Sequence, residues 1–427
     1  MSPRILAVRS ALPDNLCVQA ELTEAFAFRG RMSPAERSLL ERLHAAAEVK
    51  TRHAALPLAE YGTLLGAEAV NDRYIDEATL LGERALRTAL DAAGVAAADL
   101  DLLIVTSVTG VAVPSIDARL IPVLGMRRDI RRLPIFGLGC VAGAAGLGRL
   151  HDYLLAWPGH TAALLAIELC SLNWPTSRIT TADMVAAGLF GDGAAALIAR
   201  GEQDGAGDAT ASQVTGPQAT ESQATGPQAT ESQATGPRVT GPQVIASRSA
   251  VYPDSGDALG WRLSSDCFRI VLTTELPDVV ERGLAASVTE FLAEHDLTID
   301  DIASWICHPG GPKVLDAVQR ALKLPDSALA ASRRSLAEVG NLSSASVLHI
   351  LEMISDAERP PAGSAGLMIG LGPGVSAELV LLRWLSSGSC LASSPASGWP
   401  SSSCPRGTPR PCLDAAAWST ASAISPS

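Results

Sequence analysis

The chain of 427 residues is 47% hydrophobic and 18% charged, with a formal net charge of −12. This is the composition of a globular protein with ample chain for a buried core, built as two or three domain-sized units or as one large duplicated fold. The acidic balance argues against a general nucleic-acid binder, because phosphate contacts need basic surface, whereas a local Lys/Arg cluster can still serve an anionic small molecule.

The sequence indicates neither membrane insertion nor secretion. No segment approaches the roughly twenty apolar residues of a membrane span. The opening "MSPRILAVRSALP" lacks the apolar core and cleavage site of a signal peptide, so we expect a cytoplasmic protein. The eight cysteines include no C-x-x-C pair, so we expect neither a disulfide framework nor a structural zinc site.

Strand-like and helical segments alternate up to about Arg200. This alternation indicates an α/β fold with largely buried sheets. The apolar periodicity predicts, in chain order, a first strand in "RILAVRSALP", a helix at 80–94, a buried strand at 101–107, a strand leading into a helix of small residues at 133–150, a buried strand at 161–170 and a strand at 190–200.

Residues 203–243 interrupt this alternation. Three near-copies of one decapeptide follow each other there, "QVTGPQATES", "QATGPQATES" and "QATGPRVTGP", without any aromatic residue. Units of this kind have almost nothing to bury, so we expect a disordered loop inserted between two strands.

The α/β pattern resumes after the repeats. We predict a strand at 244–253, a helix at 275–295, a strand at 302–311 and a closing strand at 377–385. Residues 386–427 are rich in serine, proline and alanine, and we expect a disordered tail there.

The stretch "LPIFGLGCVAGAAGLGRL" at 133–150 has two interpretations. Gly137, Gly139 and Ala142 match a dinucleotide-binding fingerprint, for which Glu168 would be the distant acidic partner. Alternatively, Cys140 stands at a strand–helix junction, where the helix N-terminus would lower the pKa of its thiol and make it a nucleophile. Taken alone, the stretch leaves both open, along with a plain buried cysteine.

Two later stretches favour the nucleophile. "WICHPGGPKVL" places His308 at the end of a strand, and "GNLSSASVLHIL" places Asn341 at another strand–helix junction. Both lie beside glycines, where the backbone can approach a ligand closely. A nucleophile, an imidazole and an amide donor together predict acyl transfer to and from sulfur.

The motifs "GLGCVAGAAGL", "FGDGAAA", "HPGGP", "GNLSSAS" and "GLGPG" resemble, in order and spacing, the chalcone/stilbene synthase family, the type III polyketide synthases. The resemblance extends from about Arg4 to Leu385 outside the repeats, and the residues around the cysteine resemble bacterial members. The initiating β-ketoacyl-carrier-protein synthases also use Cys, His and Asn but do not usually show "HPGGP" or "GLGPG". Papain-like proteases differ around the cysteine.

The resemblance implies a thiolase fold, with two similar α/β halves stacked in five αβαβα layers and paired as a homodimer. The halves would be residues 1–202 and 244–385, separated by the insertion at 203–243 and followed by the tail at 386–427. It implies no metal or redox cofactor, because coenzyme A thioesters, an acyl-CoA starter and malonyl-CoA, are the substrates.

The resemblance also implies roles for three residues. Cys140 takes the starter acyl group from coenzyme A as a thioester. His308 keeps that cysteine ionised, and with Asn341 it binds the thioester oxygen of malonyl-CoA. This binding stabilises the enolate that forms as carbon dioxide leaves.

Further positions match residues around the substrate. Phe190 in "LFGDG" matches the family's gatekeeper phenylalanine, with an ordinary core aromatic as the alternative. Lys50 and Arg52 in "EVKTRH" fall where the family contacts CoA phosphates, with a solvated surface as the equal alternative. The remaining positions are expected to line the substrate pocket, partly through a loop that reaches towards the partner's cavity: Thr109, Val113, Cys170, Asn173 and Ser343.

The pocket residues carry an expectation about the starter. Small side chains at Thr109, Val113 and Cys170 resemble the alkylpyrone and alkylresorcinol synthases, which predicts a medium or long fatty acyl-CoA starter. The alternatives are a tetrahydroxynaphthalene synthase that uses malonyl-CoA alone, or an enzyme like β-ketoacyl-ACP synthase III. Asn173 counts against the naphthalene alternative, because those enzymes tend to carry a second cysteine there.

Overall fold

The computed structural model describes residues 2–175, 178–202, 241–253, 255–256, 258–265 and 267–385. The repeats at 203–240 and the tail at 386–427 lie outside the described residues, so the disorder expected for them stays a prediction. The first strand after the repeats begins at Gln243, one residue earlier than expected.

A nine-stranded sheet dominates the described chain, in the order β11-β12-β13-β8-β1-β7-β6-β4-β5. Its two parts, one from each half, meet at the single pair Arg4↔Gln243 of β1 and β8. The first part consists of β1 (Arg4–Ala11), β4 (Leu102–Thr106), β5 (Arg131–Ile135), β6 (Thr161–Leu169) and β7 (Asp192–Arg200). The second part consists of β8 (Gln243–Val251), β11 (Ile302–Cys307), β12 (Ala365–Gly372) and β13 (Ser376–Arg383).

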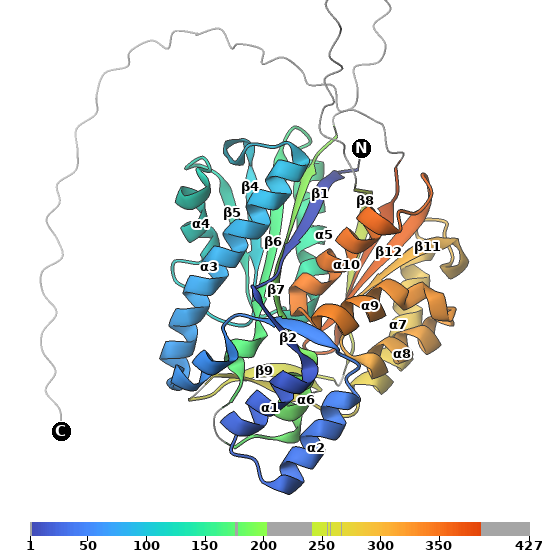
Figure 1. Ribbon diagram of the computed structural model, residues 1–427. Helices are drawn as coiled ribbons and strands as arrows, with labels where there is room; N and C mark the ends of the chain where they lie inside the picture. The colour runs from blue at the N-terminus through green and yellow to red at the C-terminus, as the bar shows by residue number, and fades with distance from the viewer. Residues whose placement is uncertain are drawn as a thin grey trace, which may run out of the picture. The chain divides into compact units, whose positions relative to one another are not determined.

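Helices make three layers around the two parts of the sheet (Figure 1). Three hydrophobic clusters fill the space between the helices and the sheet. One lies under the outer helices of each half, and the third lies in the middle and holds residues of both halves. The resulting order is αβαβα, as expected. The outer helices of the first half are α3 (Gly66–Ala93) and α4 (Ile116–Leu124), the middle ones α5 (Ala142–Ala156) and α10 (Ser346–Ala357), and the outer ones of the second half α7 (Leu276–Ala293) and α8 (Pro312–Leu322).

Smaller elements gather at one end of the layers, the lower end in Figure 1. Two short hairpin-like pairs, β2 with β3 and β9 with β10, lie beside helices there. These elements are α1 (Gln19–Arg29), α2 (Pro34–Ala45), α6 (Thr181–Leu189), β2 (Asn15–Val18), β3 (Thr51–Ala54), β9 (Leu259–Leu263) and β10 (Phe268–Leu272). Helix α9 (Ala330–Val339) packs against α10 and β3.

The middle layer is thin because its helix α5 begins with small residues. A Cβ atom on Gly143 would stand 2.1 Å from the carbonyl oxygen of Ser344, and one on Gly146 would stand 2.6 Å from a methyl group of Leu164. Real Cβ atoms do not approach so closely, so glycine lets α5 touch both the sheet and the start of α10.

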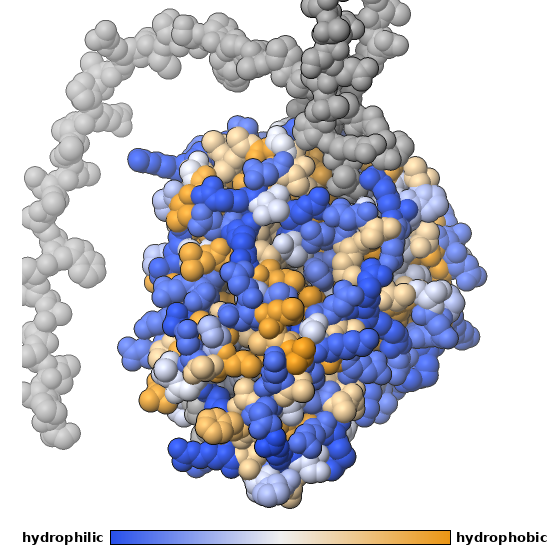
Figure 2. All heavy atoms as spheres, viewed as in Figure 1, coloured by the Kyte–Doolittle hydropathy of each residue, from blue (hydrophilic) through white to orange (hydrophobic). Residues whose placement is uncertain are grey.

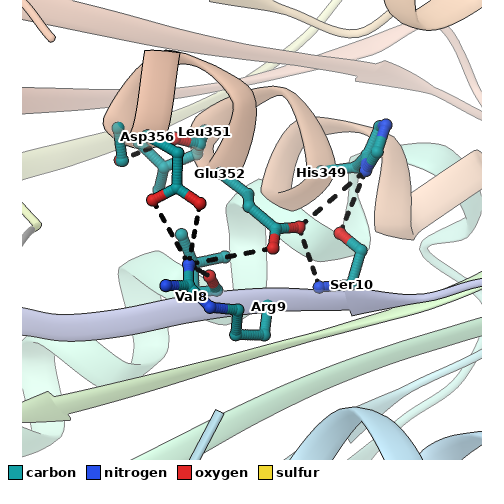
Figure 3. A network of polar contacts seen from close by, with 8 residues as sticks. Val8, Arg9, Ser10, His349, Leu351, Glu352 and Asp356 are labelled. Carbon is teal, nitrogen blue, oxygen red and sulfur yellow. Dashed lines mark hydrogen bonds and ion pairs between the residues drawn. The ribbon is translucent and has the colours of Figure 1, made fainter. Parts of the chain in front are cut away.

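A polar network fastens α10 to β1 (Figure 3). Glu352 accepts a hydrogen bond from the backbone N–H of Ser10 at 2.8 Å, and the Ser10 hydroxyl lies 3.0 Å from Nδ1 of His349. Arg9 bridges to Asp356 at 3.2 Å. Burial lowers the pKa of His349 to about 4, so the imidazole is neutral in the folded protein near neutral pH.

The surface interleaves polar and apolar side chains on the face drawn in Figure 2. Leu16 and Val18 of β2 are exposed, and single exposed apolar residues are ordinary for a folded protein. Within the described residues, no helix combines the length and the apolar character needed to cross a membrane.

Candidate active site

Cys140 lies in a single 3-10 turn, η3 (Gly139–Val141), between the end of β5 and the start of α5. The turn needs glycine at 139, because that residue has φ +58 and an added Cβ would stand 2.5 Å from the ring of Pro373. The thiol is buried, and its Sγ lies 3.4 Å from the hydroxyl of Ser343. The strand–turn–helix setting expected for Cys140 is therefore present.

The electrostatic expectation for Cys140 is wrong in this state of the protein. Burial raises the pKa of the thiol to about 12, and the nearby carboxylate of Glu168 also raises it, while the bond to Ser343 lowers it. Desolvation of a thiolate therefore outweighs the benefit of the helix N-terminus. The resting group is a thiol, which needs a base before it can attack.

His308 follows the last residue of β11 and continues the pairing of that strand. Its backbone N–H donates to the carbonyl of Ile369 on β12 at 2.8 Å. The imidazole is 2% exposed, and its Nδ1 has no hydrogen-bond partner among the described residues. Burial lowers the pKa of His308 to about 3, which favours the neutral ring.

Asn341 lies two residues after the end of α9. Gly340, between them, has φ +74 and leaves room for the carbonyl of Leu189. The Oδ1 of Asn341 accepts the backbone N–H of Ser343 at 2.8 Å and the hydroxyl of Ser346 at 3.4 Å. These two donors identify which end of the side-chain amide is the oxygen. The Nδ2 end is thereby oriented as a hydrogen-bond donor.

The three predicted residues come from three junctions that meet beside α5. Ser343 connects two of them, since its side chain contacts Cys140 and its backbone binds Asn341. The third connection runs through β12. Ile369 binds the backbone of His308, and the next residue, Gly370, packs so tightly on Val141 that an added Cβ would stand 3.4 Å from the Val141 Cα.

Glu168 is a buried carboxylate beside this centre. It lies at the end of β6 and is fully buried. Four donors surround it: the hydroxyls of Ser343 at 3.2 Å, Ser344 at 2.6 Å and Thr109 at 3.0 Å, and the backbone N–H of Val108 at 3.1 Å. Burial raises its pKa to about 6.

The environment of Glu168 excludes the dinucleotide interpretation. With four protein donors on its two oxygens, the carboxylate has no acceptor left for a ribose hydroxyl. The sequence offered Glu168 only in that role and gave no sign that it would bind Ser343 and Ser344. A glutamate next to the end of a nine-residue strand that is otherwise apolar after Thr161 was the available signal.

Phe190, Cys170 and Asn173 lie together, as the resemblance implies. They line a cavity of about 20 Å³, room for about one water molecule. The ring of Phe190 stands 5.9 Å from that of Trp261 on β9. The other lining residues, which sequence analysis did not single out, are Trp174, Pro175, Asp183, Ala186, Ala187, Trp261, Phe268 and Ile270.

The side chain of Asn173 links two chain segments beside this cavity. Its Nδ2 donates to the carbonyl of Thr109 at 2.8 Å, and its Oδ1 accepts the backbone N–H of Phe268 at 3.0 Å. The side chain of Thr109 is buried and bound to Glu168 and to the N–H of Leu169, so it faces away from the cavity. Val113 is 91% exposed and is not among the residues that line this cavity.

The two residues predicted to bind CoA phosphates, Lys50 and Arg52, differ in their exposure to solvent. Lys50 is exposed, in agreement with such a contact. Arg52 is 1% exposed, and its guanidinium donates to the carbonyl of Phe190 at 2.6 Å and to Oε1 of Gln19 at 2.7 Å. A buried guanidinium bound in this way cannot reach a CoA phosphate, so the prediction for Arg52 is wrong.

Comparisons with known proteins agree with the layered fold. The chain superimposes on the crystal structure of 1,3,6,8-tetrahydroxynaphthalene synthase from Streptomyces coelicolor A3(2), a bacterial type III polyketide synthase, with a TM-score of 0.78 and 30% identity. The match covers 90% of this chain and 99% of that one. The αβαβα layers are thus those of a thiolase fold, as predicted.

The sequence matches of both halves define the family. Residues 2–203 match the N-terminal domain of chalcone and stilbene synthases, and residues 243–386 match the C-terminal domain. A 1,3,6,8-tetrahydroxynaphthalene synthase of Streptomyces peucetius subsp. caesius is 50% identical over 380 residues, 89% of this chain and 93% of that protein. The chain belongs to the chalcone and stilbene synthase family and is a type III polyketide synthase.

Another relative is named for a different product. The alpha-pyrone synthesis polyketide synthase-like Pks18 of Mycobacterium tuberculosis is 29% identical over 357 residues, 82% of this chain and 83% of that protein. The family therefore includes relatives that make naphthalenes and relatives that make pyrones.

Proposed function

We propose that this enzyme uses malonyl-CoA as both starter and extender and forms 1,3,6,8-tetrahydroxynaphthalene or a closely related polyhydroxynaphthalene. The proposal replaces the expectation of a medium or long fatty acyl starter. It is supported by the relative of that name at 50% identity, against 29% for the relative named for pyrone synthesis.

The observation that carries the proposal is the 50% identity, over 89% of this chain, to a protein named for tetrahydroxynaphthalene synthesis. Trp261, Phe268 and Ile270 of the β9–β10 pair narrow the space beside Phe190 to about 20 Å³. Asn173 holds Phe268 in place, so its presence suits a closed cavity.

In the proposed loading step, the Cys140 thiol loses its proton and the starter acyl group moves from the sulfur of coenzyme A to the sulfur of Cys140. Neutral His308 accepts the proton of the Cys140 thiol, and the thiolate attacks the thioester carbonyl of the starter malonyl-CoA. The acyl group passes to Cys140, and coenzyme A leaves as its thiol by taking from His308 the proton that came from Cys140. The buried, unpartnered Nδ1 of His308 supports this role.

The extension step uses the two hydrogen-bond donors. The ring N–H of neutral His308 and Nδ2 of Asn341 donate to the thioester oxygen of a second malonyl-CoA. Loss of carbon dioxide leaves an enolate, whose carbon attacks the acyl carbonyl on Cys140. A carbon–carbon bond forms, the carbon–sulfur bond to Cys140 breaks, and the lengthened chain stays on coenzyme A.

We propose a homodimer that associates through β5. This strand lies at one edge of the sheet, and its residues from Arg131 to Pro134 are exposed. Leu133, Phe136 and Leu138 add exposed apolar surface along it. An unpaired edge with apolar side chains favours association with a second copy, which light scattering of the purified protein measures.

The test is product analysis by mass spectrometry with malonyl-CoA alone, and then with added acetyl-, octanoyl- and palmitoyl-CoA. We expect a naphthalene product from malonyl-CoA alone and little use of the longer starters. Trp261→Ala should open the cavity and admit octanoyl-CoA, while Trp157→Ala, which alters an exposed tryptophan, should not. A wild-type enzyme that needs a fatty acyl starter would contradict the proposal.

A further inference from the structure

The buried Arg52 holds the chain segment that carries Phe190. Its guanidinium donates to the Phe190 carbonyl at 2.6 Å, and its Cβ would be 3.4 Å from a Cβ placed on Gly191. A guanidinium can bind two acceptors in fixed directions at once, which a lysine ammonium on its flexible stem does less well. Arg52 uses this property to bind Phe190 and Gln19 together.

Gln19 extends this contact along the same segment. While its Oε1 accepts from Arg52, its Nε2 donates to the carbonyl of Gly188 at 2.9 Å. Arg52 and Gln19 therefore bind carbonyls two residues apart at the end of α6. Together they determine the course of the backbone into Phe190.

The same segment binds Asn341 on its other side. The N–H of Asn341 donates to the carbonyl of Leu189 at 2.8 Å, and the N–H of Gly191 donates to the carbonyl of Asn341 at 3.0 Å. The side chain of Arg52 passes beneath this pairing, since its Cδ would stand 3.6 Å from a Cβ on Gly340. A shift of the Phe190 carbonyl is therefore transmitted to Asn341.

The strand that carries Arg52 is itself fixed to α9, the helix before Asn341. The N–H of Lys50 donates to the backbone carbonyl of Ala337 at 2.8 Å, and the hydroxyl of Thr51 donates to the backbone carbonyl of Glu338 at 2.7 Å. Asp192 supplies a nearby opposite charge. Burial lowers the pKa of Arg52 to about 10, while the Asp192 charge raises it, so the guanidinium remains charged at neutral pH.

We propose that Arg52, with Gln19, is a positioning residue that sets the places of Phe190 and of the Asn341 amide for the decarboxylating step. The inference rests on the proposed roles of Phe190 and Asn341, and it does not depend on which starter the enzyme uses. It gives the one basic residue of "EVKTRH" that is buried a role other than phosphate binding.

Arg52→Lys tests the inference, because it keeps a positive charge near Asp192 but loses the two-armed geometry. We measure kcat and KM for malonyl-CoA from carbon dioxide release, and the rate of Cys140 alkylation by iodoacetamide. We expect kcat to fall by about 10²-fold with KM changed by less than about three-fold. Alkylation should fall far less than kcat, because Cys140 lies on η3 and is linked to Asn341 only through Ser343.

Two further variants complete the design. Gln19→Met should lower kcat in the same direction, and the Arg52→Lys/Gln19→Met double variant should lose little more than Arg52→Lys alone, because both act through one segment. Arg42→Lys, a change at an exposed arginine that binds Ser38, is the matched control and should keep wild-type kcat.

Several outcomes would overturn the inference. They are a folded Arg52→Lys enzyme with wild-type kcat, a parallel loss of kcat and alkylation, or strictly additive losses in the double variant. If Arg52→Lys does not fold, wild-type kcat in Gln19→Met overturns it and a fall of kcat alone supports it. Carbon dioxide release does not depend on the product, so failure of the naphthalene proposal would be seen separately in the mass spectra.

Discussion

At the scale of single residues, burial sets the chemistry of the site. The thiol of Cys140 and the imidazole of His308 are both neutral in the resting protein, because desolvation raises the pKa of one to about 12 and lowers the pKa of the other to about 3. An ion pair would need solvation that this site does not supply.

Replacement of Cys140 separates the two halves of the proposed chemistry. Cys140→Ala should abolish polyketide formation, while slow decarboxylation of malonyl-CoA continues because His308 and Asn341 remain. Labelled carbon dioxide release and mass spectrometry measure the two activities on one sample. Cys17→Ala, at another buried cysteine, should retain both. Full-length product from Cys140→Ala would show that another group carries the acyl chain.

Sequence analysis located the residues that belong to a local motif and missed those whose setting is determined by contacts between distant parts of the chain. Cys140, His308 and Asn341 stand at strand–helix junctions whose glycines show in the sequence. Arg52 was misplaced because a buried arginine looks like an exposed one in "EVKTRH". Arg52 and Ala54 are two residues apart on β3, so their side chains point to the same, buried side of the strand. This spacing was the available signal that Arg52 is buried.

The size of the cavity could not be predicted for a related reason. Small residues at Cys170 and Thr109 indicated an open channel, but Trp261 and Phe268 arrive from the distant β9–β10 pair and fill it. Thr109 turns to Glu168 instead. Local side-chain size says little about a cavity whose opposite wall comes from another part of the chain.

At the scale of elements, close approach of α5 to η7 (Ser343–Ala345) brings Cys140 and Ser343 together. The contact depends on Gly143, because an added Cβ would meet the Ser344 carbonyl at 2.1 Å. This backbone oxygen cannot move aside as the end of a flexible side chain could. The helix that follows Cys140 and the turn after Asn341 are therefore held at one fixed distance.

Gly143→Ala should force these elements apart. We expect a loss of about 1–3 kcal/mol in the free energy of unfolding, the usual effect of overpacking a core, and a larger proportional loss of kcat. Gly62→Ala is the matched control, since nothing lies within 4 Å of its added Cβ. Urea unfolding measures stability, and an unchanged midpoint for Gly143→Ala would refute the close packing of α5.

The contact between β1 and α10 should make stability depend on pH through His349. The pKa of this group is about 4 when folded and 6.5 when unfolded, because burial disfavours the charged ring. Between these values the unfolded chain binds the proton and the folded one does not, so stability falls as pH falls from 6.5 through 4. At pH 5 the loss from this group is about 2 kcal/mol.

His349→Gln should weaken that dependence, because glutamine does not titrate and can still bond to the Ser10 hydroxyl. Urea unfolding at pH 7 and pH 5 gives the comparison. Glu168 acts in the opposite direction: burial raises its folded pKa from 4.5 to about 6, so its contribution is present below 4.5 and is lost as pH rises through 6. An equal pH dependence in His349→Gln and wild type would exclude His349 as a source.

At the scale of the whole molecule, the two halves join where β7 ends and β8 begins. Arg200 and Gln243 pair with the same residue, Arg4, from opposite sides. Neighbouring strands lie about 4.8 Å apart, so these ends are about 10 Å from each other. A few residues of chain suffice to connect them.

Deletion of residues 205–238 should therefore leave the fold and kcat close to wild type. The remaining linker spans the gap between β7 and β8, and closing a shorter loop changes the entropy only modestly. Gly241 and Pro242 are retained, because Pro242 accepts a hydrogen bond from Ile5. Calorimetry and turnover measure the effect, and a melting temperature lowered by many degrees would show that the removed segment supports the body.

The position of β1 also bears on how the chain reaches this structure during synthesis. Strand β1 leaves the ribosome long before its partners β7, which ends at Arg200, and β8, which it touches at Gln243. Contacts so distant along the chain form slowly, and until β7 is made the apolar β1 has no strand to pair with. A nascent chain stalled before Asp192 would expose β1 to chaperones, and the early N-terminus would be one of the last parts to become native.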